Sequence, residues 1–195
     1  MEESNQLVLL EDEIQYDGKD RDAIIRGIDL GKKVVLITSF LSATMEKKLA
    51  FVIFKILCKY KKSDLHASLY SMIKELAINA TKANAKKIFF DEHQITDENH
   101  PEYNLVSKKF KDSLTEDWIV TYGKKAKENM ILVCIVLEHS PSGLVLKVKN
   151  TSSINKKDEN RMRDKLRKGL QYEDLTDYYV QNQDQTEGEG IGLVL

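Results

Sequence analysis

The chain has 195 residues, of which 42% are hydrophobic, and its 30 Lys and Arg against 31 Asp and Glu leave a formal net charge of −1. This length suits one well-packed domain, and the balanced charge gives no whole-chain argument for nucleic acid or an anionic membrane as a partner. The two cysteines, Cys58 and Cys134, lie in apolar runs without a neighbouring cysteine or histidine at metal-ligand spacing. We therefore expect two buried, reduced thiols.

The N-terminal stretch MEESNQLVLLEDE is acidic and lacks the basic and apolar layout of a signal peptide. The most apolar segment, Leu49 to Cys58, is interrupted by Lys55 and has about half the length needed to cross a bilayer. These two features predict a cytoplasmic protein.

The first third of the chain predicts a strand, a helix, a strand and a second helix. Residues 6–10 form a short apolar run that suits an edge strand, and a short helix is expected near residues 21–28. Residues 33–39 are apolar and β-branched, which favours a strand. The helix expected from Met45 to Tyr60 is apolar nearly all round, so it is either buried on two sides or covers a protein partner or a second copy.

The strongest helical signal lies in residues 69–87. Apolar residues recur there at helical spacing on one face. Glu75, Asn79 and Lys82 fall on another face, three or four residues apart. A carboxylate, a carboxamide and an amine in one stripe can serve a base, a metal ion and a phosphate, or they can form a solvated face.

Short elements are predicted to follow this helix. It is expected to end near Asn84, and Ile88 to Phe90 is expected to open a strand. A polar, turn-rich stretch over residues 91–101 leads into an amphipathic helix over residues 103–114, and an extended piece is expected over residues 118–122.

The clearest strand signal comes from residues 130–138 and 144–150, joined by HSPSG, whose proline and glycine suit a turn. Residues 151–187 are polar, with a weakly amphipathic helix around Met162 and a second short helix expected over residues 174–182. These elements predict an α+β fold: a two-layer α/β sandwich with a mixed, mostly antiparallel sheet and helices on one face.

Two motifs far apart in the chain carry a family resemblance. Residues 75–83, ELAINATKA, resemble the N box (E-L-x-x-N-A-x-K) of the Bergerat-fold (GHKL) ATPases, and the stretch up to Ile88 is similar to the helix-to-strand turn after that box. Residues 188–193, GEGIGL, resemble the second glycine box, G-x-G-[LI]-G-L. The hairpin that runs into Asn150 occupies the place of the first glycine box. The order matches the family, and the chain looks most like its histidine kinase-like ATPase domains.

The resemblance implies a site for ATP and Mg²⁺. Asn79 would offer its carboxamide oxygen to Mg²⁺, a hard cation that prefers oxygen ligands. Lys82 would bring positive charge to the phosphates, and Glu75 would be the catalytic base that orients or deprotonates the nucleophile. The implied ATP-binding set also includes Asn150, Ser152, Thr186, Gly188, Gly190, Gly192 and Leu193.

The first glycine box departs from the family pattern D-x-G-x-G. Asn150 replaces the aspartate that accepts a hydrogen bond from the adenine amino group, and Ser152 replaces a glycine. Asn150 can still accept through its oxygen, but it is uncharged and its amide can face either way. Glu189 opposes phosphate unless a basic residue of the lid, residues 151–187, offsets its charge. We expect weakened or altered base recognition.

The expected function is Mg-ATP binding in cytoplasmic signal transduction, with phosphate transfer to a protein partner or slow ATP hydrolysis. None of the four histidines (His66, His93, His100, His139) lies in a phosphoacceptor context. Residues 63–195 would form the ATP-binding domain with its lid, and residues 1–62 would form part of the fold or a dimer or partner surface. The alternative is a non-catalytic regulatory module, as in anti-sigma-factor partner switching, which binds a protein through residues 49–57 and has a degraded nucleotide site.

Overall fold

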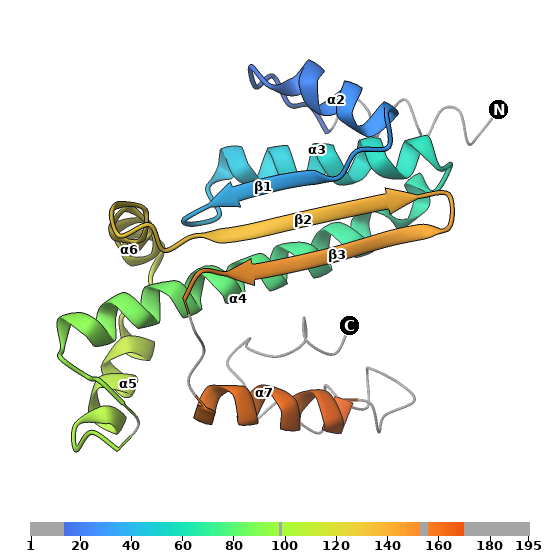
Figure 1. Cartoon of the computed structure of the whole chain (residues 1–195). Coiled ribbons are helices and arrows are strands. Elements are labelled where there is room, and N and C mark those ends of the chain that lie inside the picture. Colours follow the sequence, from blue (N-terminus) through green and yellow to red (C-terminus); the bar gives the residue numbers. More distant parts are fainter. Residues whose placement is uncertain (1–13, 98, 153–155, 170–195) are drawn as a thin grey trace.

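The computed structural model describes residues 14–97, 99–152 and 156–169, which form an α+β fold with one small sheet (Figure 1). The elements in chain order are α2 (Arg21–Asp29), β1 (Val34–Thr38), α3 (Ala43–Lys59), the one-turn helix η1 (Ser63–Leu65), α4 (His66–Glu92), α5 (Tyr103–Asp112), α6 (Glu116–Glu128), β2 (Val133–Ser140), β3 (Gly143–Asn150) and α7 (Lys156–Gly169). The predicted α+β class is therefore confirmed.

The sheet is antiparallel, with the strand order β1-β2-β3. β1 pairs with β2 in the register Val34↔Leu137, and β2 pairs with β3 in the register Ile135↔Val148. The predicted hairpin is thus present as β2 and β3. Every strand pairing in the described part of the chain is antiparallel, so the parallel component of a mixed sheet is not found there.

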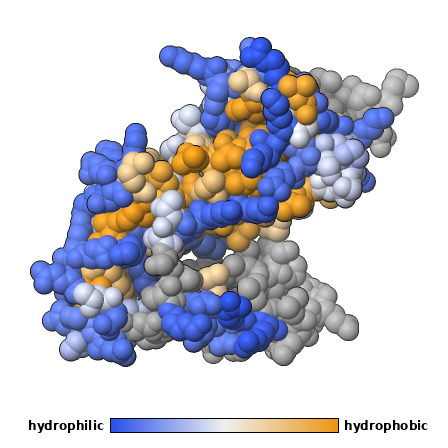
Figure 2. All heavy atoms as spheres, in the orientation of Figure 1, coloured by the Kyte–Doolittle hydropathy of each residue, from blue (hydrophilic) through white to orange (hydrophobic). Residues whose placement is uncertain are grey.

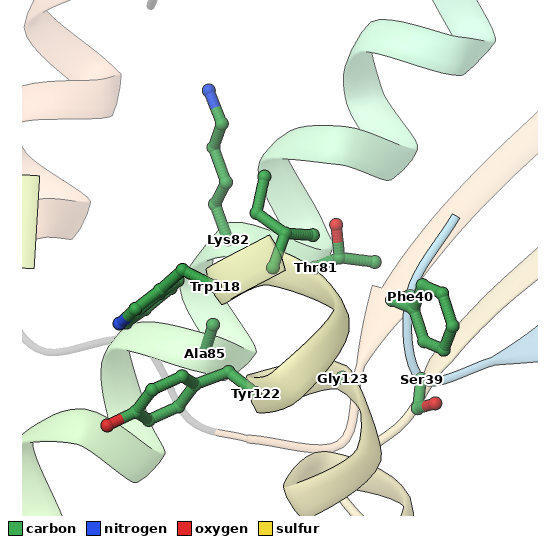
Figure 3. A pocket seen from close by; sticks show the side chains of 9 residues that line it. Ser39, Phe40, Thr81, Lys82, Ala85, Trp118, Tyr122 and Gly123 are labelled. Atoms are coloured by element: carbon green, nitrogen blue, oxygen red, sulfur yellow. The ribbon is translucent and has the colours of Figure 1, made fainter. Parts of the chain in front are cut away.

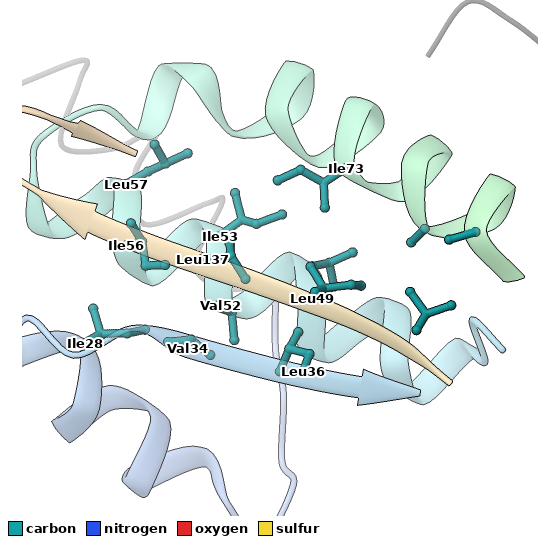
Figure 4. Packing of buried hydrophobic residues seen from close by; sticks show 14 residues of the cluster. Ile28, Val34, Leu36, Leu49, Val52, Ile53, Ile56, Leu57, Ile73 and Leu137 are labelled. Carbon is teal, nitrogen blue, oxygen red and sulfur yellow. The ribbon is translucent and has the colours of Figure 1, made fainter. Parts of the chain in front are cut away.

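Helices α3 and α4 cover one face of this sheet (Figure 1). Alternate strand residues, such as Leu36 and Leu137, point into this layer and meet Leu49 and Ile53 of α3 and Ile73 of α4 (Figure 4). All five side chains are at most 3% exposed. This packing gives the main core its two layers and places α4 against β3.

Helix α3 is buried on two sides. Its sheet-facing side belongs to the main core. On the other side, the Phe51 ring lies 5.7 Å from the ring of Tyr16, and the Phe54 ring lies 5.7 Å from that of His66. Phe51 and Phe54 are only 2% and 1% exposed. The helix that is apolar all round therefore packs within the fold and leaves little apolar surface for a partner.

Helix α4 is longer than the sequence predicted. It continues to Glu92, so the strand predicted at Ile88 to Phe90, and with it the helix-to-strand turn, is wrong. These residues pack against α5 and α6: the ring of Phe89 lies 5.9 Å from that of Trp118, and the ring of Phe90 lies 5.4 Å from that of Tyr103. A short apolar run suits a buried helix as well as a strand, and here the aromatic neighbours decide for the helix.

The extended piece predicted at residues 118–122 is also wrong, because these residues form the first turns of α6. The Thr115 hydroxyl accepts a hydrogen bond from the Trp118 amide at 3.3 Å and caps the helix. Trp118 and Tyr122 stack with their ring centroids 4.0 Å apart, which one helical turn between them allows. Together with α5 and the C-terminal half of α4, α6 forms a second, aromatic core.

The remaining expectations have mixed outcomes. The helix expected around Met162 is present as α7. The strand expected at residues 6–10 and the helix expected at residues 174–182 lie outside the described residues. Cys58 and Cys134 form no disulfide, as predicted, but both are half-buried rather than buried. None of the described helices combines the length and apolarity that crossing a bilayer requires.

The outer face of the sheet, which no helix covers in this view, carries an exposed apolar patch over β1 and β2 (Figure 2). Val35 and Ile37 of β1 are 43% and 58% exposed, and Val145 of β3, which adjoins β2, is 52% exposed. Val136 lies between Val35 and Lys147 in the strand register. An apolar patch with charged neighbours is typical of a surface that contacts another protein.

Candidate functional site

The predicted polar stripe lies on α4. Because an α-helix has 3.6 residues per turn, Glu75, Asn79 and Lys82 fall within a sector of about 60°. This sector lies opposite the side on which Ile73 and Ala77 pack into the main core. All three polar side chains are half-buried, and none forms a hydrogen bond or ion pair within the described part of the chain.

Other charged residues of α4 are paired. The ammonium group of Lys74 lies 2.6 Å from the Glu46 carboxylate, and that of Lys87 lies 2.7 Å from the Asp91 carboxylate. The hydrogen bond to Glu46 raises the pKa of Lys74 above its ordinary value. The stripe therefore differs from its surroundings, because its polar groups remain available to a ligand.

The end of β3 contacts α4 at Ala80 and Asn84. The Asn150 amide nitrogen donates hydrogen bonds to the Ala80 carbonyl at 3.0 Å and to Asn84 Oδ1 at 3.2 Å. The Ser152 hydroxyl donates to the same Asn84 oxygen at 2.7 Å. Ala80 directly follows Asn79 in the N-box-like motif. The end of the hairpin and the N-box-like helix are thus in direct contact.

The Ala80 carbonyl determines which way the Asn150 amide faces. A carbonyl oxygen can only accept a hydrogen bond, so the amide nitrogen of Asn150 must face it. Asn150 Oδ1 then lies on the other side of the amide, and no described residue donates a hydrogen bond to it. The orientation that the sequence left open is therefore defined by the helix, and Asn150 offers a hydrogen-bond acceptor.

Sequence reasoning missed Asn84 as a site residue. Its side chain is fully buried at 0% exposure, and its amide nitrogen has no partner among the described residues. A buried donor without a partner costs about 1–3 kcal/mol. Helical spacing could have predicted this burial. Asn84 lies seven residues, or about two turns, after Ala77, and therefore on the core-facing side of α4.

A small hollow adjoins the stripe where α6 packs on α4 (Figure 3). Its volume is about 10 Å³, room for at most one water molecule and far too little for a nucleotide. The Lys82 ammonium group extends away from it (Figure 3). Its lining residues are Ser39, Phe40, Thr81, Lys82, Ala85, Trp118, Ile119, Tyr122 and Gly123.

The residues available to Mg²⁺ are few. Within the described residues, no three His, Cys, Asp or Glu side chains come together as a metal site. Mg²⁺ bound with ATP needs only one or two protein ligands, because phosphates and waters complete its shell. The unpaired, half-buried carboxamide of Asn79 fits that requirement.

Two histidines are buried and engaged. His66 Nε2 donates to the Ala50 carbonyl at 3.1 Å. His139 Nε2 donates to the Lys32 carbonyl at 3.1 Å, and its Nδ1 accepts from the Tyr60 hydroxyl at 2.9 Å. Burial lowers the pKa of both imidazoles. Neither ring is presented to a phosphoryl donor.

The phosphate-binding part of the predicted site cannot be placed. Thr186, Gly188, Gly190, Gly192 and Leu193 lie outside the described residues. Their assignment stays a prediction.

Comparisons with known proteins do not name a family. No family model matches the chain, and no solved structure matches it significantly. The chain is similar to a protein of Treponema pallidum (strain Nichols) described as uncharacterized, with 27% identity over 176 residues. The match covers 90% of this chain and 34% of that protein, so the chain spans about a third of the length of its relative.

Proposed function

We propose that the chain is an Mg-ATP-binding domain of the histidine kinase-like Bergerat class. The observation that carries the proposal is the contact between the end of β3 and α4. Asn150 donates to the Ala80 carbonyl across 70 positions of sequence. It thereby joins the base-recognition position that the resemblance implies to the helix that carries Asn79 and Lys82 of the N-box-like motif.

Each stripe residue has a role that its chemistry suits. Asn79 holds Mg²⁺ through its carboxamide oxygen, and Lys82 offsets the negative charge of the phosphates. Bound Mg²⁺ neutralises charge on the phosphate oxygens. Phosphoryl transfer depends mainly on such positioning and charge stabilisation. Glu75, one turn before Asn79, orients or deprotonates a nucleophile, which is water or a hydroxyl or imidazole group of a protein partner.

Isothermal titration calorimetry with ATP and Mg²⁺ tests the binding proposal. The wild-type chain is expected to bind, and Asn79→Ala is expected to weaken binding by about tenfold or more, the value of one good polar contact. The matched control is Asn104→Ala, because Asn104 is exposed on α5, away from the stripe. No heat with the folded wild-type chain, or equal affinity in Asn79→Ala, would contradict the proposal.

The second candidate is a non-catalytic regulatory module with a degraded nucleotide site. The exposed apolar patch at Val35, Ile37 and Val145 favours it, because such a surface suits a protein partner. It differs from the surface that the sequence predicted, since residues 49–57 are largely buried. A folded wild-type chain that fails to bind Mg-ATP supports this candidate over the first.

A further inference from the structure

The fully buried Asn84 belongs to a chain of hydrogen bonds with only one consistent arrangement. The Ala80 carbonyl accepts from Asn150, so the Asn150 amide cannot rotate to present its oxygen to α4. Because the Asn150 nitrogen also faces Asn84 at 3.2 Å, Asn84 must present its oxygen there. That oxygen accepts from Ser152 as well, at 2.7 Å.

The arrangement is kept although it leaves the Asn84 nitrogen buried and without a partner in the described part of the chain. Rotating the Asn84 amide would bring two donor groups, its own NH₂ and that of Asn150, face to face. Asn84 and Ala80 therefore hold the Asn150 amide from one side. Only the Asn150 oxygen remains for a ligand on the other side.

We propose that Asn84 is a positioning residue for base selectivity, which acts together with the Ala80 carbonyl by holding the Asn150 amide nitrogen toward α4 and its oxygen toward the nucleotide base. The inference rests on the proposed ATP-binding function. An asparagine that rotates freely offers a donor to a 6-oxo purine as readily as an acceptor to a 6-amino purine. A fixed Asn150 offers only the acceptor, which pairs with the amino group of adenine and opposes the oxygen of hypoxanthine or guanine.

ATP and inosine triphosphate differ at this position of the purine, so their affinity ratio in the presence of Mg²⁺ measures the effect. The wild-type chain is expected to bind ATP about tenfold or more tightly than inosine triphosphate, because a site built around one hydrogen bond disfavours an analogue that lacks it. Asn84→Ala removes one of the two acceptors that hold the Asn150 amide and leaves the Ala80 carbonyl, so it is expected to lower the affinity ratio by about threefold or more. A general loss of structure would lower the affinity for both nucleotides and leave the ratio of the two affinities unchanged.

Two matched variants separate the orientation of Asn150 from packing. Asn84→Asp keeps an oxygen that accepts from Asn150, and Asn104→Ala changes an exposed asparagine of α5 away from this contact, so both are expected to retain the preference for ATP. If Asn84→Ala does not fold, Asn84→Leu removes the same hydrogen bonds while it fills the space.

The outcomes distinguish the inference from the proposed function. Equal binding of both nucleotides by the wild-type chain overturns the inference and leaves the ATP-binding function standing. An unchanged ratio in a folded Asn84→Ala or Asn84→Leu variant also overturns the inference. Failure of the folded wild-type chain to bind either nucleotide overturns the proposed function itself.

Discussion

Asn150 lies beside two hydrogen-bond acceptors, and this explains why an aspartate would not suit the position. A carboxylate there would face the Ala80 carbonyl at 3.0 Å without a proton to donate, whereas the Asn84 amide can rotate to present its NH₂. We expect Asn150→Asp to lower the free energy of unfolding by about 1–3 kcal/mol at neutral pH, measured by urea denaturation. Asn104→Asp, at an exposed position of α5, should change it by less than about 0.5 kcal/mol. Equal stability of Asn150→Asp and the wild type would show that the amide is not held as described.

Glu75 is the stripe residue whose role is catalytic in the proposed function. Glu75→Gln keeps the shape of the side chain but removes the base, so we expect Mg-ATP affinity to stay within about threefold while ATP turnover falls by about 100-fold or more. Calorimetry and a phosphate-release assay measure the two quantities. Glu128→Gln, exposed at the end of α6, is the control. Turnover that survives in Glu75→Gln would exclude Glu75 as the base.

The same residues show what sequence can and cannot provide at this scale. The spacing of Glu75, Asn79 and Lys82 placed them on one side of a helix, because that geometry follows from helical periodicity alone. The partner of Asn84 did not follow, because Asn150 lies 66 positions away and no local pattern specifies that contact. A lone polar residue on an apolar helix face indicates burial without naming its partner.

At the scale of elements, the packing of α6 depends on a glycine. A Cβ at Gly123 would lie 2.5 Å from the Phe40 ring, closer than atoms can approach, whereas a Cβ at Gly27 in α2 meets nothing within 4 Å. We expect Gly123→Ala to lower the unfolding free energy by about 1–3 kcal/mol through overpacking. Gly27→Ala should raise it by up to about 1 kcal/mol through helix propensity. Urea or thermal unfolding measures both, and a stabilised Gly123→Ala would mean that α6 does not pack closely on residue 40.

Elements were predictable where local chemistry was unambiguous. β3 alternates between exposed and half-buried residues, and Gly143 marks the turn before it, so the hairpin followed from the sequence. The C-terminal end of α4 and the helical state of residues 118–122 did not follow. Both depend on aromatic contacts between α4, α5 and α6, such as that of Phe89 with Trp118, which only the tertiary structure supplies.

At the scale of the whole molecule, the mixture of elements was enough to predict the class of the fold, but the sequence did not predict that His66 and His139 are buried. His66 lies between Phe54 and Tyr70, with its ring stacked on that of Tyr70 at 5.9 Å. His139 joins the start of β1 to the end of α3 through Lys32 and Tyr60. Each histidine is 8% exposed, so both link separate parts of the main core as neutral rings.

This burial makes stability depend on pH in a defined direction. Burial lowers the pKa of both histidines below 6.5, the ordinary value that they regain when the chain unfolds, and Lys59 lowers that of His139 further. As pH falls below 6.5, the unfolded chain binds protons that the folded chain does not, so the free energy of unfolding falls, by at most about 1.4 kcal/mol per pH unit for each histidine.

The carboxylates with lowered pKa, such as Asp20 and Glu92, lose their contribution to the free energy of unfolding in a more acidic range, below 3.8 and 4.5 respectively. Urea denaturation between about pH 7 and pH 5 is therefore expected to report mainly on the two buried histidines. The double variant His66→Gln/His139→Gln should flatten the curve, whereas Asn104→Gln, an uncharged change at an exposed position of α5, should retain it. A wild-type chain equally stable at both ends of that range would contradict the buried, neutral state of the two rings.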